Sequence, residues 1–383
     1  EKLMQLTVGV NPGEWWGANW LGVHAISAST AGAIVGAMHG SEIFPKDWLA
    51  WATPIARPWF KISSVVKKRI DEEKVVVRDI EALAKKKSGG ASKLHDKIKG
   101  AMLAGAIGNA MGSPVEGRMY ADIDKQYPKH VLTVLDPKRL ESEDDNQMAM
   151  HLVETYIERD GLPVMARHFG KTWFDRLNRD HFFPLCMGNA YDLIRAGEDP
   201  RIIGHWSVVT GSTVMCLEPV GMYNIADPEW AAQDATAVSY MYQRGLDVTA
   251  AAMLAATTAN ALRNDATVDS VLQAALDVAP RTPLITFDKR KFRSAYDYIA
   301  TCLDIAAKYD DVLEARKELY DQCLFYSMID PLELWGLALA MFKIAEGDVR
   351  QAAVGGTNIG RDSDTIAGRA AMLSGALKGT GGV

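Results

Sequence analysis

The chain has 383 residues, of which 48% are hydrophobic and 23% charged, and its formal net charge is −6. This composition describes an ordinary globular protein, long enough for one large core or two domains. The net negative charge argues against a general nucleic-acid binder, because such a composition does not force the protein to have a strongly basic surface. The most apolar stretch, residues 26–38, is short and rich in Gly and Ser, so no membrane span is predicted. Because the N-terminus is no secretory signal and the four cysteines lack zinc spacing, we expect a cytoplasmic protein.

The beginning of the chain resembles its end. Adding 339 to each number pairs residues 16–40 with residues 355–379, and seven of these 25 positions are identical. The first copy keeps the small packing residues but lacks the acids, since Val23, Ala25 and Ile26 stand opposite Asp362, Asp364 and Thr365. We predict that residues 1–57 are a degenerate repeat of the C-terminal segment. The pattern leaves open whether they are the tail of an upstream domain or a packed extension.

Residues 58–92 change in character. Runs of mixed charge precede Lys85, Lys86 and Lys87, and Ser88-Gly89-Gly90 follows. This pattern predicts an exposed charged helix that ends in a hinge, so the segment is interpreted as a linker. The lysine run is read as a solvated face, with phosphate binding as the alternative.

From residue 93 onward the pattern is helical almost throughout. Small residues recur at three- and four-residue steps, at Gly100, Ala104, Gly105, Gly108 and Gly112. Because glycine is unfavourable inside helices, its repeated use predicts a helix whose backbone lies very close to a neighbour. Further apolar stripes follow in residues 148–157, 231–242, 249–262 and 268–278. The prediction is an all-α, compact multi-helix domain that covers residues 93–383.

Two acidic knots stand far apart in the chain. One is Glu143-Asp144-Asp145-Asn146, and the other is Asp362-Ser363-Asp364-Thr365. Their side chains offer only oxygen donors, which suit a hard divalent cation such as Mg²⁺ or Mn²⁺. Taken alone, each knot is also explained by helix N-capping. We expect folding to bring the two knots together around metal.

Four stretches of the chain, in this order, resemble the ADP-ribosylglycohydrolase family, which includes the dinitrogenase-reductase-activating glycohydrolases. They are residues 100–116, 143–146, 211–221 and 360–367. The most specific of them is the last, Gly-Arg-Asp-Ser-Asp-Thr-Ile-Ala, which resembles the closing metal motif of the family almost letter for letter. The resemblance covers roughly residues 96–380.

The resemblance implies an all-α fold with a dinuclear site for two divalent cations, Mg²⁺ or Mn²⁺. The implied metal ligands are Glu143, Asp144, Asp145, Asp362, Asp364 and Thr365. The implied catalytic residues are Glu116, Glu143, Asp145 and Asp362. The implied substrate-binding residues are Asn109, Gly211, Ser212, Thr213 and Asn358. The implied reaction is hydrolysis of an ADP-ribosyl or related ribosyl N-glycosidic bond, on an ADP-ribosylated protein or a ribosyl small molecule. No nucleic-acid backbone and no membrane is expected as a partner.

The chain departs from the family pattern at several positions. Asn109 and Cys216 stand where the family usually has an aspartate and an arginine, and Glu143 and Asn146 replace two threonines. These departures bear on the substrate more than on the metal site. A second hypothesis is therefore a catalytically degenerate ADP-ribose binder or structural homologue. A third, an all-α enzyme acting on prenyl diphosphates, is disfavoured because residues 144–148 lack the later aspartate of that motif. The sequence leaves open the group on the ribose, the metal, the role of Glu143 as ligand or base, and the oligomeric state.

Overall fold

The computed structural model describes residues 91–137, 144–182, 184–283 and 292–383, with isolated positions between Met38 and Ala50. The chain divides into two units, Glu1–Asp79 and Ile80–Val383, and all named helices belong to the second. The predicted repeat in residues 1–57 and nearly all of the predicted linker fall outside the described residues and stay predictions. The same holds for Glu143.

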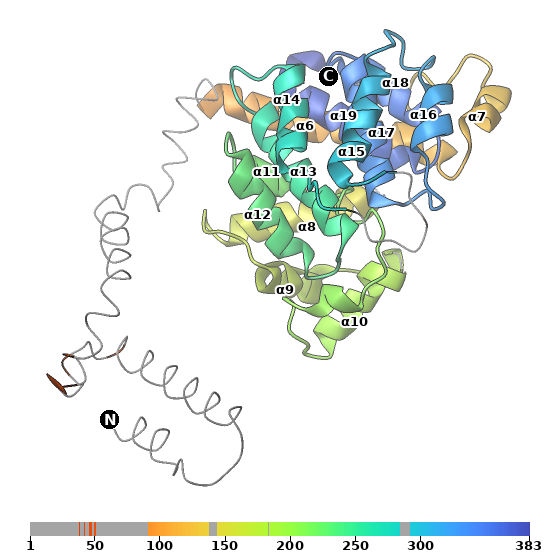
Figure 1. The fold of residues 1–383 in the computed structure, drawn as a ribbon. Coiled ribbons are helices and arrows are strands. Elements are labelled where there is room, and N and C mark those ends of the chain that lie inside the picture. Colours follow the sequence, from red (N-terminus) through yellow and green to blue (C-terminus); the bar gives the residue numbers. More distant parts are fainter. Residues whose placement is uncertain are drawn as a thin grey trace, which may run out of the picture. The chain divides into compact units, whose positions relative to one another are not determined.

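The described part of the second unit is built from α-helices joined by turns and short helical segments (Figure 1). Within those ranges no β-strand is formed, which confirms the predicted all-α fold. The helices are α6 (Ala91–Gly112), α7 (Tyr120–Gln126), α8 (Asp144–Glu158), α9 (Ala166–Arg176), α10 (Asn189–Arg195), α11 (Glu218–Tyr223), α12 (Pro228–Ser239), α13 (Leu246–Ala261), α14 (Val268–Val278), α15 (Ala295–Ala306), α16 (Arg316–Cys323), α17 (Pro331–Ile344), α18 (Val349–Ile359) and α19 (Ser363–Lys378). Short 3-10 segments include η4 (Ser113–Val115), which follows α6 directly. None of the described helices is both long and apolar enough to cross a membrane.

Helices α6 and α19 form the most extensive helix–helix contact of the unit. Their backbones approach so closely that a Cβ atom added at Gly108 would collide with the carbonyl oxygen of Ala367. An added Cβ at Gly112 would likewise collide with the carbonyl oxygen of Ser363. The predicted close-packing role of the glycine stripe is therefore confirmed. As a consequence, the C-terminal end of α6 lies against the N-terminal end of α19.

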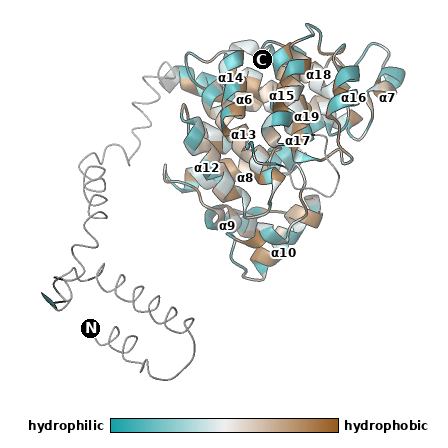
Figure 2. Ribbon diagram, in the orientation of Figure 1, coloured by the Kyte–Doolittle hydropathy of each residue, from teal (hydrophilic) through white to brown (hydrophobic). Residues whose placement is uncertain are grey.

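Helix α17 forms the centre of the hydrophobic core. Nearly all of its residues are buried, including the fully buried Trp335 and Phe342, and it contacts α13, α15, α18 and α19. Helices nearer the surface carry hydrophobic and hydrophilic residues side by side (Figure 2), as expected where one face is buried and the other is solvated. The core therefore fixes α19 from several directions, and with it the acids at its N-terminus.

Candidate metal centre

The described residues of the two acidic knots lie together in the structure. Asp145 is in the first turn of α8, and Asp362 and Asp364 stand at the beginning of α19. The hydroxyl of Thr365 donates a hydrogen bond of 3.2 Å to Asp145 Oδ2, across a sequence separation of 220 residues. The convergence that the sequence predicts is thus confirmed, and it places carboxylates at the N-termini of two helices, where the helix dipole favours negative charge.

A loop acid, Glu116, joins Asp362 and Asp364 in a close group of carboxylates. Glu116, Asp362 and Asp364 each offer one carboxylate oxygen, and these three oxygens lie within 4.8 Å of one another. The two aspartates are buried and Glu116 is exposed. A set of oxygen donors without His or Cys fits a hard divalent cation, and the spacing lets a single ion reach all three.

Glu116 reaches the aspartates because its loop is paired with the loop before α19. The amide of Gly117 donates to the carbonyl of Arg361, and the amide of Arg361 donates to the carbonyl of Arg118, both at 2.7 Å. Gly360 has φ of 73°, and an added Cβ there would collide with the Arg118 carbonyl. Glycine is therefore required at residue 360 for the two loops to approach.

Arg361 anchors this loop pair to the core. Its own φ is 63°, a left-handed value that is uncommon outside glycine. Its guanidinium donates to Glu333 Oε1 at 2.6 Å and to the carbonyl of Phe325 at 3.0 Å. Glu333 belongs to α17 and is fully buried, so the residue next to Asp362 is fixed to the centre of the core. Neither Arg361 nor Glu333 was predicted from the sequence as a positioning residue.

Asp362 occupies the N-cap position of α19 but does not cap it. Its side chain makes no hydrogen bond to the helix amides, whereas Asp330 caps α17 and Asp348 caps α18 through such bonds. Helix capping alone therefore does not account for this acid. Its carboxylate faces other carboxylates instead, those of Asp364 and Glu116.

The charges of the centre repel one another. Burial raises the pKa of Asp145 well above its usual range, and the neighbouring Asp364 and Asp144 raise it further. Burial, followed by the charge of Asp364, also raises the pKa of Asp362 well above its usual range. A bound cation would relieve this repulsion, and the donor set and its charge thus agree in favouring a metal.

Asn109 lies between the two knots. It is fully buried on α6, and its amide nitrogen is 3.1 Å from Asp145 Oδ2 and 3.5 Å from Asp364 Oδ2. Its amide oxygen accepts a hydrogen bond of 3.0 Å from Asn146. Two of the four departures from the family pattern, Asn109 and Asn146, therefore lie inside the centre and contact each other.

A buried ion pair lies behind the centre. Arg369 of α19 and Glu218 of α11 are 1% and 3% exposed, and their charged atoms are 2.5 Å apart. The positive charge of Arg369 acts to lower the pKa of Asp145, against the larger effect of burial. Neither Arg369 nor Glu218 was predicted from the sequence as part of the site. The signal was a charged residue within a helix of small residues and another within the apolar segment 211–221.

The remaining predicted site residues are bound within the protein. Ser212 and Thr213 are buried and contact the buried Asp247, with the Thr213 hydroxyl 2.5 Å from Asp247 Oδ1. An added Cβ at Gly211 would collide with the side chain of Leu334. These contacts favour a packing role for the segment, and its role in substrate binding stays a prediction.

Asn358 also has its hydrogen-bonding groups engaged inside the protein. Its amide nitrogen donates to the carbonyl of Val131, and its amide oxygen accepts from the amide of Val131, both at 2.8 Å. A further bond of 2.8 Å goes to the carbonyl of Val354. These bonds favour a structural role, and substrate binding by Asn358 stays a prediction.

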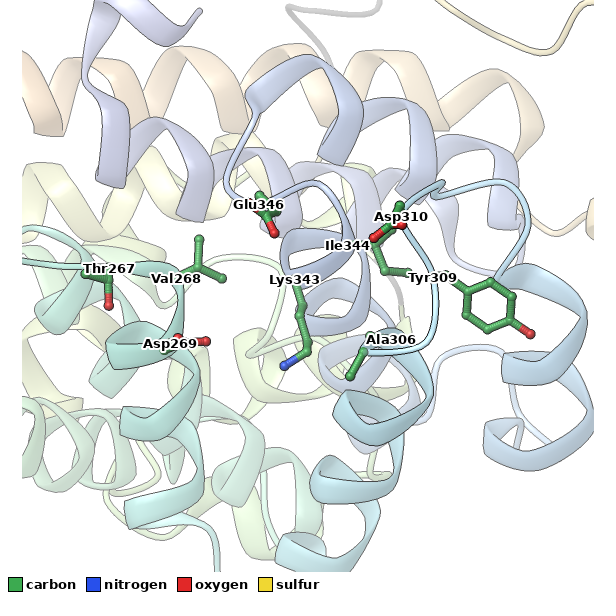
Figure 3. A pocket seen from close by; sticks show the side chains of 10 residues that line it. Thr267, Val268, Asp269, Ala306, Tyr309, Asp310, Lys343, Ile344 and Glu346 are labelled. Atoms are coloured by element: carbon green, nitrogen blue, oxygen red, sulfur yellow. The ribbon is translucent and has the colours of Figure 1, made fainter.

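A cavity of about 580 Å³ lies elsewhere, between the N-terminal end of α14 and the C-terminal ends of α15 and α17 (Figure 3). Asp269, Lys343 and Glu346 are among its lining residues, and none of the predicted site residues is. Gly347, which follows the lining residue Glu346 in the chain, lies against Leu377 and Lys378 at the C-terminal end of α19. Since α19 has 16 residues, this end is roughly 24 Å from the acids at its beginning. The cavity is separate from the metal centre.

A model of the ADP-ribosylglycohydrolase family matches residues 91–383 of the chain. The chain belongs to this family. The uncharacterized protein YegU of Escherichia coli (strain K12) is 27% identical over 307 residues, which span 75% of this chain and 89% of that protein. A solved structure described as an ADP-ribosylglycohydrolase-related protein complex has a TM-score of 0.54 at 19% identity, over 76% of this chain and 91% of that chain. The structural likeness shows the shared fold. Membership of the ADP-ribosylglycohydrolase family supports glycosyl hydrolase activity and the use of divalent cations in general.

Proposed function

We propose that the protein is a divalent-cation-dependent hydrolase of an ADP-ribosyl or related ribosyl N-glycosidic bond. The observation that carries this proposal is the convergence of Glu116, Asp362 and Asp364 from opposite ends of the helical unit of an ADP-ribosylglycohydrolase. The buried aspartates supply the negative charge that a cation needs, and the exposed Glu116 gives the centre an edge that solvent and substrate reach.

The residues that would hold cations follow from the geometry and the resemblance. Glu116, Asp362 and Asp364 would hold one ion, and Asp144, Asp145 and Thr365 would hold the second, with Glu143 as a further ligand or base. When bound, Mg²⁺ or Mn²⁺ supplies orientation of ribose hydroxyls and polarisation of a water.

The acidic side chains supply the proton transfers. Hydrolysis forms a bond between the water oxygen and the anomeric carbon of the ribose, and it breaks the bond from that carbon to the leaving nitrogen. One carboxylate accepts the proton from the water and then donates it to the leaving nitrogen, which leaves as the neutral amine. We assign this exchange to Glu116, whose side chain is exposed, and we assign to the buried Asp145 and Asp362 the negative charge of the centre.

We propose an ADP-ribosylated protein or a ribosyl small molecule as substrate, and the cytoplasm as the place of action. The support for the location is chemical. Cys186, Cys216, Cys302 and Cys323 are all free thiols buried in the unit, as expected in a reducing compartment.

Replacement of a buried aspartate tests the proposal. We expect Asp364→Ala to abolish Mn²⁺ binding in titration calorimetry and to lower hydrolysis of ADP-ribosyl-arginine and related N-ribosides by at least about 10³-fold, the scale at which removal of a catalytic group acts. A chelator is expected to have the same effect on the wild-type chain. Asp269→Ala, an exposed acid at the separate cavity, is the matched control and should retain activity. Full activity of Asp364→Ala, or activity in the presence of a chelator, would refute the proposal.

A second function is favoured by one observation. Asn109 places a neutral amide between two knots of carboxylates, where the family usually has a further acid. This substitution suits a catalytically degenerate binder of ADP-ribose. Calorimetry with ADP-ribose together with turnover assays separates the two functions, since tight binding without hydrolysis of any ribosyl substrate supports the binder.

A further inference from the structure

Both carboxylate oxygens of the buried Glu333 face donors. Oε1 accepts from Nε of Arg361 at 2.6 Å, and Oε2 accepts from Nη2 of Arg361 at 3.1 Å and from the backbone amide of Phe325 at 2.5 Å. An ionised carboxylate is an acceptor only, whereas a protonated carboxyl group carries one O–H donor. Whichever oxygen of Glu333 takes a proton, that donor meets a donor of Arg361, and at least one bond between the two side chains is lost.

The surroundings of Glu333 bring its titration close to neutral pH. Burial raises the pKa of Glu333 to about 7, against the lowering effects of Arg361 and of the Phe325 amide. The negative charge of Asp330, the N-cap of the same helix, raises the pKa of Glu333 further. Because the ordinary pKa of a glutamate is about 4.3, the free acid would be ionised at neutral pH.

Three groups on the neighbouring helices also interact electrostatically with Glu333, namely Tyr298 and Cys302 of α15 and Tyr320 of α16. Burial raises the pKa of Tyr298 and of Cys302 well above their usual ranges, and it raises the pKa of Tyr320 to about 12. These groups are therefore neutral near pH 7, while the guanidinium of Arg361 keeps its charge. Among these side chains, Glu333 is the one that changes its charge near neutral pH.

Arg361 connects Glu333 to the carboxylates of the centre. It directly precedes Asp362, and its amide and its carbonyl are both hydrogen-bonded at 2.7 Å to the loop that carries Glu116. Its φ of 63° is uncommon outside glycine, so the contacts of its side chain hold a backbone conformation that is otherwise unfavourable. Loss of a bond to Glu333 consequently loosens the loop pair and, with it, the positions of Asp362 and Glu116.

We propose that the contact between Glu333 and Arg361 makes the metal centre sensitive to protons. While Glu333 is ionised, the two loops are held together and the cation position of Glu116, Asp362 and Asp364 is formed. When Glu333 takes a proton, Arg361 is released and the affinity for the cation falls. The inference rests on the proposed function, because it concerns the same centre, but Glu333 itself lies outside the residues that would bind the cation.

Mn²⁺ titration calorimetry of the full chain at about pH 6 and about pH 8 tests the proposal without an assay of activity. With a pKa of about 7, about one molecule in eleven has Glu333 ionised at the lower pH and nearly all have it ionised at the higher pH, so this residue changes the affinity by up to about tenfold. Glu333→Gln removes this contribution, whereas the titrations of the metal-binding carboxylates are common to both chains. The variant should bind Mn²⁺ about tenfold more weakly than the wild type at about pH 8, and the difference should shrink to about twofold or less at about pH 6.

Asp192→Asn is the matched control. Asp192 also accepts two hydrogen bonds from one guanidinium, that of Arg179, but it belongs to α10 and is exposed. This variant should keep the Mn²⁺ affinity of the wild type at both pH values.

Hydrogen exchange of the amides of Gly117 and Arg361, which bond the two loops together, measures the effect of Glu333 without metal. In the metal-free wild-type chain their protection factors should fall from about pH 8 to about pH 6. In Glu333→Gln they should be low at both pH values.

The outcomes separate this proposal from the proposed function. A ratio of wild-type to Glu333→Gln affinity that does not change with pH would overturn the proposal and leave the metal-dependent function in place. Constant protection of the Gly117 and Arg361 amides in the wild-type chain would overturn it as well. Absence of any Mn²⁺ binding by the wild-type chain would remove both. If Glu333→Gln does not fold, which circular dichroism reports, the exchange data of the wild-type chain decide the question.

Discussion

Buried acids occur in two settings in this protein. Glu218, Glu333 and Asp330 each contact a donor of the protein, a guanidinium or the amides of a helix N-terminus. Asp362 and Asp364 instead lie against each other and against Glu116. The first group contributes to the stability of the fold, while the second is held at a cost in electrostatic repulsion. The comparison teaches that the partners of an acid, rather than its burial, distinguish structural acids from candidate functional ones.

The largest effect is expected where an internally paired acid loses its partner. Arg369→Met removes the guanidinium 2.5 Å from Glu218 and leaves that carboxylate buried without compensation. We expect a loss of about 3–5 kcal/mol in the free energy of unfolding. Urea denaturation measures it. The double variant Glu218→Gln with Arg369→Met should recover most of the loss, and failure to recover would show that the pair does not act as a unit.

A middle-sized effect contrasts two aspartates at equivalent positions. Asp348→Ala removes a cap whose carboxylate accepts from the amide of Gln351 at 2.8 Å, and should destabilise the fold by about 1 kcal/mol. Asp362→Ala removes no cap and relieves repulsion, so the metal-free variant should be at least as stable as the wild type. Thermal unfolding in the presence of a chelator measures both. An equal loss of thermal stability in the two variants would show that Asp362 stabilises the fold as much as the capping Asp348 does.

The smallest effect is expected in the dependence of stability on pH. Burial raises the pKa of Asp247 well above its usual range, although Thr213 and Ser212 donate to it. A raised pKa means that the folded state holds the proton more tightly than the unfolded state does. Stability from this group is therefore full below about pH 4, the usual carboxyl range, and falls as the pH rises towards the folded pKa.

Asp247→Asn removes this titration. The stability of the variant relative to the wild type should accordingly increase from about pH 4 to about pH 8. Denaturation at a series of pH values measures the difference. A difference independent of pH would show that Asp247 keeps its charge throughout this range.

Local pattern was sufficient for much of the fold. Glycines at three- and four-residue steps predicted that this helix lies very close to a neighbour, and the structure identifies the neighbour as α19, which contacts Gly108. The two acidic knots were also predicted to meet, since oxygen donors in a recognisable motif indicate a shared cation. The start and end of α14, residues 268 and 278, match the predicted apolar stripe.

The ion-pair partners of the buried charged residues could not be predicted from the neighbouring sequence. The pair of Arg361 with Glu333 and that of Arg369 with Glu218 join residues far apart in the chain, and nothing near either residue specifies the other. Substrate binding by Asn358 stays a prediction, and the hydrogen bonds of its amide to the backbone of Val131 are a contact that only the tertiary fold creates. Tertiary proximity sets these interactions, so motif and periodicity do not reveal them.

Glu116 and the buried aspartates are held in place by different parts of the fold, so substitutions near the one are expected to have little effect on the other. The aspartates belong to a helix wedged against α6, whereas Glu116 belongs to a short surface segment fastened by the backbone of Gly117, Arg118 and Arg361. Substitutions in that segment are expected to reorient the side chain of Glu116 and to leave Asp362 and Asp364 in place. The accessible acid and the buried aspartates are thus held by different parts of the fold, so substitutions in a few surface residues are expected to act on the leaving group more than on the cation.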